Sequence, residues 1–393
     1  DAFRTRLVGN LSHILVDEYQ DIEADAYEFV GLLAGKAQLG AENRLQILAV
    51  GDDDQSIYQF AGANVEFIRR FQDDYADRSN PKFVKDVTVH YLIDNYRSTK
   101  HIIAAANAVI AQNTDRMKTD QPIQIDQLRF SDANGGYLED LDPVAGGQIQ
   151  VLRTEGELEQ AMTCLDEVKR YVQLSDRHQY EHCCVIARTN KELLPIRIAL
   201  EAADIPCSIV GSAQMPNLAR VREVYDWLQY LKSHSEAFWT GDKLIKQVQK
   251  HMSRAFASSP AGKLLREIAG EFYGETSGIE QSCADILDFF YEALHEHKRR
   301  GSNGIGVQLS TAHKAKGLEF DCVLILDGSW CKNIRNVAAM EEARRLYYVS
   351  MTRACKSLSL FQQVGYNTRF INEIPTEIRQ TRRLSPVIND AEA

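Results

Sequence analysis

The stretch LSHILVDEYQDIEADAYEFVGLL, residues 11–33, decides how the fold of this chain is interpreted. It joins a short apolar run, residues 14–16, directly to two carboxylates, Asp17 and Glu18, and then to the tripeptide YQD. A short β-branched run is typical of a buried strand. In an open parallel sheet, ligands bind at the carboxyl ends of the strands. The pattern therefore predicts a buried strand that ends either at a solvated loop or at a binding site.

The composition is that of a soluble globular protein with more than one domain. At 393 residues the chain exceeds the usual size of one domain, and its 44% hydrophobic and 25% charged residues argue against disordered and fibrous classes. No apolar stretch reaches the roughly 20 residues that span a bilayer, and the first residues lack the pattern of a secretory signal. We therefore expect a cytoplasmic protein.

The net charge and the spacing of the cysteines bear on nucleic-acid binding, zinc sites and disulfide bonds. The net charge of −10 argues against attraction of a polyanion to the whole surface, but Lys, Arg and aromatic side chains along a groove still allow nucleic-acid binding. The eight cysteines are scattered and include no CxxC pair. We therefore expect reduced thiols, and neither a zinc ribbon nor a disulfide scaffold.

The order apolar strand, loop, helix repeats along the chain. LQILAV (45–50) ends at GDDD, and VTVHYLID (87–94) ends at NYR, after which Ser98 is expected to cap a helix over residues 98–113. QIQVLRT, CCVIARTN and CSIVG begin a second series, which VQLSTAHKAKG, FDCVLILDG and SLSLFQQ continue after a block of helices alone. The pattern predicts an α/β fold with a first domain, a connection, a second domain in two parts and a helical insertion. Their respective bounds are 1–113, 114–147, 148–230 with 305–393, and 231–304.

The two carboxylates after the first strand have the chemistry of a nucleotide hydrolase. Such an enzyme needs one carboxylate to hold hydrated Mg²⁺ and another to orient and deprotonate the attacking water. Adjacent carboxylates such as Asp17 and Glu18, leaving a buried strand, supply that geometry. As an isolated dipeptide the pair is more often a solvated turn, so the other motifs of the chain decide between the two interpretations.

Five strings carry a family resemblance. In chain order they are LVDEYQD, VGDDDQSIYQFAGA, LIDNYRST, LSTAHKAKGLEFDCVLI and EEARRLYYVSMTRA, and they resemble the motifs of the UvrD/Rep/PcrA family of superfamily 1 DNA helicases. The likeness extends through ARTNKELLPIRIALEAADIPCSIVG. It implies two RecA-like parallel-sheet domains of the P-loop NTPase fold, which close on ATP at their interface. The first would be truncated at its N-terminus, and the second would be interrupted by the helical insertion.

The resemblance assigns catalytic roles to five residues. Asp17 would bind Mg²⁺ through water, and Glu18 would be the general base. Gln55 would touch the γ-phosphate, although a polar turn residue is the alternative interpretation. Arg97 and Arg353, one from each domain, would stabilise the charge that develops on the phosphoryl group, so that hydrolysis depends on closure.

Further residues complete the nucleotide site that the resemblance implies, with ATP and Mg²⁺ as its ligands. Tyr96 would stack on the adenine. Glu319, in KGLEFD, would hydrogen-bond the ribose, and Gly317 of the same motif would also belong to the nucleotide-binding residues. Gln20 and Asp21 would couple the site to the rest of the domain.

Aromatic side chains in the same motifs predict a path for DNA. Tyr58 and Phe60 alternate in SIYQF, a spacing that places both rings on one face of an extended segment. Stacking on bases is tolerant of sequence, while core packing is the alternative role for such a pair. His313, Arg188 and Asn190 match family positions that contact the single strand.

The chain departs from the family pattern in three places. No GxxxxGK[ST] phosphate-binding loop occurs, and the family carries this loop before the DE motif, so we expect the C-terminal part of a longer protein. These residues alone are then expected to hydrolyse ATP negligibly. Ala61 stands where the family commonly has an arginine directed at DNA. The insertion, 231–304, is shorter than the regulatory subdomain of well-known members, so strand separation is less strongly implied than translocation.

The sequence as a whole favours an ATP-driven, Mg²⁺-dependent motor on single-stranded DNA, with the 3′ to 5′ polarity that the resemblance implies. Its partners would be single-stranded DNA, junctions of single and double strands, and repair or recombination proteins. One alternative is a non-catalytic DNA-binding scaffold; a GxxxxGK[ST] upstream favours the motor, and its absence favours the scaffold. Another is a motor fused to a nuclease or to a further helicase domain. Against the scaffold, the catalytic set is intact.

Overall fold

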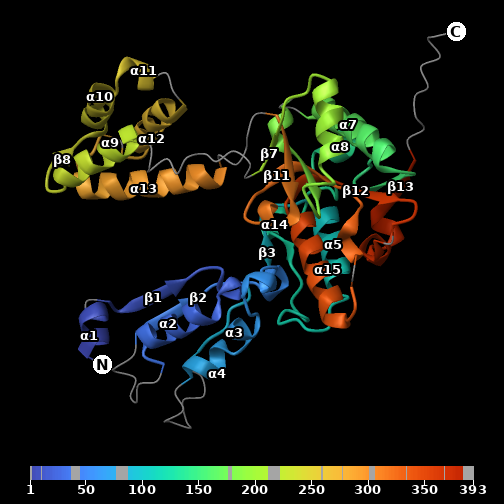
Figure 1. Cartoon of the computed structure of the whole chain (residues 1–393), viewed down its shortest axis with the longest axis horizontal. Helices are drawn as coiled ribbons and strands as arrows, with labels where there is room; N and C mark the ends of the chain where they lie inside the picture. The colour runs from blue at the N-terminus through green and yellow to red at the C-terminus, as the bar shows by residue number, and fades with distance from the viewer. Residues whose placement is uncertain are drawn as a thin grey trace. The chain divides into compact units, whose positions relative to one another are not determined.

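The computed structural model describes most of the chain and divides it into two compact units. The described residues are 2–9, 11–36, 45–76, 87–175, 179–210, 222–257, 260–276, 278–300, 306–332, 334–366 and 368–383. The first unit comprises Asp1–Cys207 with Gly306–Ala393, and the second comprises Ser208–Ile305. Figure 1 labels the elements of both units.

A seven-stranded sheet forms the centre of the first unit. Its strand order is β13-β5-β12-β11-β6-β10-β7, and β13, β5, β12, β11, β6 and β10 pair in parallel. The strands are β5 (Ile149–Thr154), β6 (Cys183–Ala187), β7 (Cys207–Ile209), β10 (Val307–Thr311), β11 (Phe320–Ile325), β12 (Ala354–Gln363) and β13 (Arg379–Arg382). Because parallel strands are covered on both faces, they appear in the sequence as continuous apolar runs. The predicted α/β class with parallel strands is confirmed.

Helices pack on this sheet in two pairs. One pair is α7 (Glu157–Leu174) with α8 (Leu194–Ala202), which carries proline in its first turn; the other is α5 (Lys100–Ile110) with α15 (Val337–Met351). Figure 1 shows α5 and α15 side by side, and both contact β12. The predicted first domain therefore does not end in a core of its own at residue 113, because its last helix packs into the large sheet.

The N-terminal part of the first unit contains a two-stranded parallel sheet of β1 (His13–Val16) and β2 (Gln46–Ala49). The helices around it are α1 (Ala2–Val8), α2 (Ala24–Ala34), α3 (Glu66–Arg69) and α4 (Phe71–Tyr75). The prediction that β1 is buried is wrong for Leu15, which is 73% exposed. With only two strands described in this sheet, Leu15 and its register partner Leu48 lie exposed side by side.

The strand expected over residues 87–94 is reduced to two residues. β3 (Asp94–Asn95) pairs with β4 (Gln124–Ile125), and residues 88–93 form no described strand. A strand exists only through pairing, and the described partner strand, β4, is only two residues long. The predicted cap is also different: Ser98 donates its hydroxyl to the carbonyl of Ala354 (2.6 Å), and α5 begins after Thr99.

The second unit is mainly helical, as expected for the insertion. Its elements are α9 (Arg222–Ser233), β8 (Phe238–Trp239), α10 (Gly241–His251), α11 (Arg254–Ala257), α12 (Pro260–Thr276), β9 (Gln281–Ser282) and α13 (Cys283–Arg300). Trp227, Leu231, Ile268 and Phe290 are among the fully buried side chains of its separate core. The helices thus begin before the predicted start of the insertion at residue 231.

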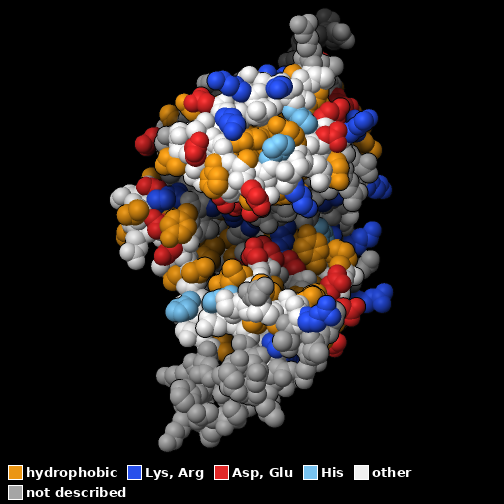
Figure 2. All heavy atoms as spheres, turned by 90° about the vertical axis from the view of Figure 1, so that its left-hand side faces the viewer, with side chains coloured by type: hydrophobic (Ala, Val, Ile, Leu, Met, Phe, Trp, Pro, Cys, Tyr) orange, Lys and Arg blue, Asp and Glu red, His pale blue; other side chains and the backbone are white. Residues whose placement is uncertain are grey.

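The connection predicted over residues 114–147 contains short elements, η5 (Gln127–Arg129) and α6 (Leu138–Leu141), besides β4. The eight cysteines are all free thiols, as expected. Among the described helices, none combines the length and the apolar character that crossing a bilayer requires. On the face drawn in Figure 2, acidic and basic side chains are interspersed, so the net charge of −10 forms no uniform field there.

Candidate active site

The backbone turns sharply where β1 ends. Glu18 has a φ of 51°, in the left-handed region that a residue with a side chain rarely adopts. The N–H of Glu18 donates to the Asp17 carboxylate (2.9 Å), and the 3₁₀ turn η1 (Tyr19–Asp21) follows. Tyr19 and Gln20 are buried by this turn, while Asp17 and Glu18 remain exposed. Backbone strain of this kind is often found at functional sites.

A hydrogen-bond network joins the ends of β1 and β2. Gln20 donates its amide to the Glu18 carboxylate and accepts from the N–H of Asp52 (2.9 Å). The Asp52 carboxylate in turn accepts from the side-chain amide of Gln55 (2.8 Å). Gly51 permits this approach, because a Cβ there would lie 2.6 Å from the Gln20 Oε1. Two of the predicted catalytic residues, Glu18 and Gln55, are therefore connected through Gln20 and Asp52.

Lys316 is a central residue of the site that the sequence interpretation missed. It follows the short helix α14 (Ala312–Ala315). Its ammonium donates to the Asp21 carboxylate and to the backbone carbonyl of Gln55 (2.9 Å), and it lies 3.5 Å from the Glu18 carboxylate. Burial raises the pKa of the Asp21 carboxyl, while Lys316 opposes that shift. Lys316 could have been identified from the sequence, because it is the lysine of the motif KGLEFD, directly before Gly317.

Four predicted residues of the nucleotide site lie in the segments that follow β3 and α14. Arg97 donates to Glu319 (2.7 Å), so these two residues bind each other in this structure. Tyr96 is exposed, and its carbonyl accepts from Arg129 (2.8 Å). Gly317, at φ 80°, adopts a left-handed conformation that suits glycine.

Arg353 is a buried cation with no carboxylate ion-paired to it among the described residues. It is 3% exposed, and its guanidinium donates to the carbonyls of Val349 (3.0 Å) and Leu318 (3.2 Å). Burial, and then the positive charge of Arg97, lower the pKa of Arg353 to about 10. Burying a charge without an opposite charge is unfavourable. The pair of cations therefore forms a place that favours an anion.

The predicted DNA contacts Tyr58, Phe60 and His313 form a ring cluster. Phe60 lies 6.1 Å from Tyr58 and 5.1 Å from His313 between ring centroids, and the Tyr58 hydroxyl donates to the His313 carbonyl (3.1 Å). The expected extended segment is wrong, since Phe60 lies in the 3₁₀ turn η4 (Gln59–Ala61). Phe60 is 71% exposed, which excludes core packing as its role.

Two further predicted DNA contacts follow β6. Arg188 is half-buried, and Asn190 is exposed. Burial, and then the charge of Arg188, lower the pKa of His313 to about 4. His313 is therefore neutral near pH 7 and would contact a nucleic acid as an uncharged ring. No described contact joins Asn190 to the ring cluster.

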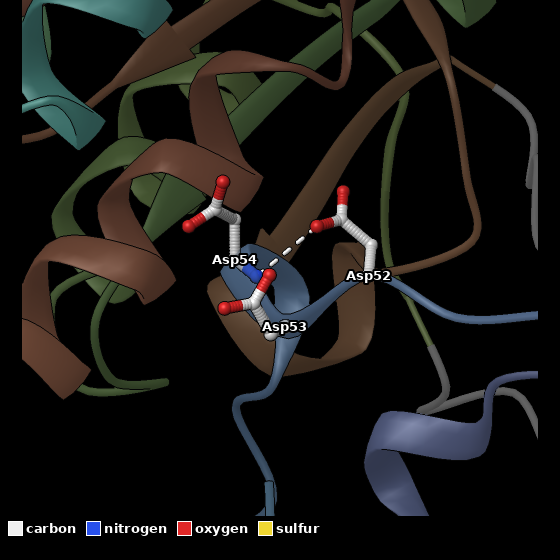
Figure 3. Close-up of side chains that lie close together, drawn as sticks. All are labelled: Asp52, Asp53 and Asp54. Atoms are coloured by element: carbon white, nitrogen blue, oxygen red, sulfur yellow. Dashed lines mark hydrogen bonds between the residues drawn. The ribbon is translucent and has the colours of Figure 1, made fainter. Parts of the chain in front are cut away.

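Figure 3 shows three carboxylates together, Asp52, Asp53 and Asp54, which we call the acidic turn. Their oxygen atoms lie within 4.8 Å of one another, close enough for a metal ion. Each carboxylate nevertheless has a basic partner nearby. The pairs are Arg116 with Asp54 (2.7 Å), Lys118 with Asp52 (2.7 Å) and Arg69 with Asp53 (3.6 Å). The acidic turn therefore fits an ion-pair network better than a metal site, and Asp17 remains the candidate for Mg²⁺.

The substitution Arg116→Met is expected to destabilise the fold by about 3–5 kcal/mol, because the fully buried Asp54 carboxylate loses both hydrogen bonds to a cation and keeps only Lys118, 3.9 Å away. Urea denaturation of the 393-residue chain measures this change in the free energy of unfolding. The matched control is Arg197→Met, which breaks an ion pair of equal length (2.7 Å) on the surface of α8 and is expected to change little. Equal effects of the two substitutions would contradict the prediction.

Comparisons with known proteins identify the family of this chain. A family model described as UvrD/REP helicase N-terminal domain matches residues 1–76, and one described as UvrD-like helicase C-terminal domain matches residues 90–256 and 262–363. The second match alone covers more than half of the chain.

Similar curated proteins include three with helicase names. ATP-dependent DNA helicase UvrD1 of Mycobacterium tuberculosis is 24% identical over 95% of this chain and 59% of its own length. DNA helicase II of Salmonella typhimurium is 25% identical over 96% and 61%, and the probable DNA helicase II homolog of Rickettsia conorii is 27% identical over 93% and 64%. The chain thus spans about three fifths of the length of these relatives.

A solved structure, the C-terminal domain of a possible DNA helicase from Lactobacillus plantarum, matches 73% of this chain and 98% of its own at 12% identity, with a TM-score of 0.35. A TM-score of this size does not establish a common fold. The sequence matches do establish the family, and the chain belongs to the UvrD-like helicases.

Proposed function

We propose that this chain is part of an ATP-dependent DNA translocase or helicase that moves 3′ to 5′ on single-stranded DNA. The observation that carries the proposal is Arg353, a buried cation without a carboxylate partner among the described residues, close enough to Arg97 for their charges to interact. The charges of Glu18 and Glu319 also act on Arg353, so the predicted base and the predicted ribose contact share its surroundings.

The residues present fit a triphosphate with Mg²⁺. The two arginines supply positive charge where phosphate oxygens need it, and guanidinium groups suit bidentate contacts to phosphate. Asp17, exposed at the carboxyl end of β1, would hold Mg²⁺ through water. When bound, Mg²⁺ neutralises part of the charge that develops on the phosphoryl group. Arg97 would exchange its ion pair with Glu319 for the ligand.

The chain's own residues then divide the work of hydrolysis. Glu18 would accept a proton from the attacking water, and the amide of Gln20 keeps its carboxylate in one orientation. The side-chain amide of Gln55 donates one N–H to Asp52, which leaves its side-chain carbonyl and its second N–H for water and phosphate. Arg353 would stabilise the developing charge from a position that packing already fixes.

Lys316 would couple this site to DNA. Its ammonium binds Asp21 and the Gln55 carbonyl and also lies over the Tyr58 ring, 5.3 Å from the centroid. Tyr58 belongs to the ring cluster. A base that stacks on these rings and displaces them would therefore also move the Lys316 side chain, which binds the Gln55 backbone carbonyl. This arrangement supports hydrolysis that depends on DNA.

The sheet of β1 and β2 supports a further part of the proposal, that additional protein completes this site. The apolar side chains of Leu15, Leu48 and Leu32 are all more than half exposed, whereas parallel sheets are normally covered on both faces. The additional protein would supply the phosphate-binding loop, for which the printed sequence has no GxxxxGK[ST] motif. The printed chain alone is then expected to release no phosphate from ATP.

The DNA half of the proposal is tested by Phe60→Ala. We expect the affinity of the printed chain for an oligothymidylate to fall by about 1–3 kcal/mol, because one exposed stacking ring is lost. Fluorescence anisotropy of a labelled oligonucleotide measures this affinity. The matched control is Phe130→Ala, which removes an equally exposed ring (74%) that has no described contact with the ring cluster. Unchanged affinity for Phe60→Ala, or equal losses for both variants, would contradict the role of the ring cluster.

A further inference from the structure

Residues 113–118, which we call the strap, lie between the acidic turn and helix α15. At the C-terminal end of the strap, Arg116 makes two hydrogen bonds to the buried Asp54 carboxylate, at 2.8 and 2.7 Å. The backbone N–H of Met117 donates to Asp53 (2.8 Å). The strap is therefore anchored to the acidic turn by bonds that water does not reach, since the Arg116 side chain is 5% exposed.

The N-terminal end of the strap is bonded to α15. Both the backbone N–H and the hydroxyl of Thr114 donate to the Glu341 carboxylate, at 2.7 and 2.9 Å. Arg345, one turn further along the helix, donates to the carbonyl of Asp115 (2.8 Å). Helix α15 ends two residues before Arg353. The strap thus links the turn that carries Gln55 to the helix that ends just before Arg353.

Lys118 is the strap residue closest to the proposed chemistry. Its ammonium lies 2.7 Å from one oxygen of Asp52, and the other oxygen accepts from the Gln55 amide. The Asp52 backbone N–H also donates to Gln20, which holds Glu18. The Asp52 carboxylate therefore orients the Gln55 side chain, and Lys118 is the cation that lies against it. The link to Glu18 runs separately, from the Asp52 backbone through Gln20.

The acidic turn explains why this cation is needed. The dashed line in Figure 3 marks the hydrogen bond from the Asp54 N–H to Asp52, which brings the three carboxylates close together. Asp54 is bound mainly by Arg116 and lies 3.9 Å from Lys118, whereas Lys118 is 2.7 Å from Asp52 and is its ion-pair partner among the described residues. Without Lys118, like charges would repel Asp52 and release the Gln55 amide from its acceptor.

We propose that Lys118 is a positioning residue for Gln55, acting through Asp52, and that the strap couples Gln55 to Arg353. This inference rests on the proposed function, because Gln55 needs a fixed orientation only if a nucleotide is hydrolysed beside it. Removing Lys118 would then slow the hydrolytic step and leave the affinity for nucleotide largely unchanged, since neither Lys118 nor Asp52 is among the residues proposed to contact the phosphates.

The test is steady-state ATP hydrolysis by the full-length protein at saturating single-stranded DNA. For Lys118→Met we expect kcat to fall about 10-fold or more, as for other outer residues that orient a catalytic group, with KM for ATP within about twofold of wild type. Lys118→Arg keeps the ion pair and is expected to restore most of the activity. In an Asp52→Asn background, adding Lys118→Met should cause little further loss.

The control for a merely structural effect is Lys356→Met, which breaks a partly buried Lys–Asp pair with Asp321 (3.1 Å) elsewhere in the first unit. Equal losses in this control and in Lys118→Met, or a wild-type kcat for Lys118→Met, would overturn the inference and leave the proposed function standing. A wild-type protein that hydrolyses no ATP overturns the proposed function, and this inference with it.

Discussion

Glu18→Gln in the full-length protein is expected to lower DNA-stimulated ATP hydrolysis by about 10²–10⁴-fold while nucleotide binding persists. The substitution keeps the size of the side chain and its ability to accept the Gln20 amide, but it removes the group that would take a proton from water. Glutamine tolerates the left-handed backbone at position 18 no worse than glutamate, so the turn after β1 is retained. Phosphate release and binding of a fluorescent ATP analogue measure the two properties separately.

Two controls make this result specific. Glu28→Gln removes another exposed carboxylate, on α2, and is expected to hydrolyse ATP as wild type does. The 393-residue chain, whose sequence has no phosphate-binding loop motif, gives the background rate of ATP hydrolysis. If wild type exceeds neither the background nor the Glu18→Gln variant, the motor proposal fails, and the non-catalytic DNA-binding scaffold becomes the better interpretation.

Arg353→Met is expected to lower ATP hydrolysis strongly and to cause no loss of fold stability. Loss of an arginine that stabilises the transferring phosphoryl group lowers kcat by about 10³–10⁵-fold. The nucleotide-free fold should lose no stability, because Arg353 is a buried charge with hydrogen bonds to carbonyls and no ion pair with a described carboxylate. Replacing such a charge by an apolar side chain removes its desolvation penalty.

A second buried arginine, on α15, provides the contrast. Arg344 is paired through two hydrogen bonds, at 3.0 and 2.7 Å, with Glu373, so Arg344→Met is expected to cost about 3 kcal/mol of stability. Urea denaturation of the printed chain compares the two variants, and ATP hydrolysis is measured on the full-length protein. Equal destabilisation by both substitutions would contradict the interpretation of Arg353 as a cation held ready for an anionic ligand.

The large parallel sheet was predictable because its signals are local. CCVIA is a continuous apolar run and FDCVLI is interrupted only by Asp321, and in the structure they are the neighbouring strands β6 and β11, almost entirely buried. The run over residues 87–94 has the same appearance, but it forms a strand only at its last residue and the next, because the local pattern does not reveal whether a neighbouring strand exists.

Several contacts of the site depended on residues far apart in the chain. Lys316 binds Asp21 across nearly 300 positions, and Arg116 binds Asp54 across 62. Arg97 and Glu319, each expected on the nucleotide, pair with each other. Neither partner in such a pair carries a local signal of the other, because an ion pair is specified by position in space and not by spacing along the chain.

The sequence by itself determined the family, the α/β class and the residue types of the site, because these depend on motifs and on hydrophobic patterns that each segment carries alone. Only the tertiary structure decided that α5 packs into the large sheet, that Asp52 and Asp54 of the acidic turn are ion-paired with the strap and that Arg353 is buried without a described carboxylate partner. The physical reason is that burial and charge pairing are properties of the assembled chain, set by which surfaces exclude water together.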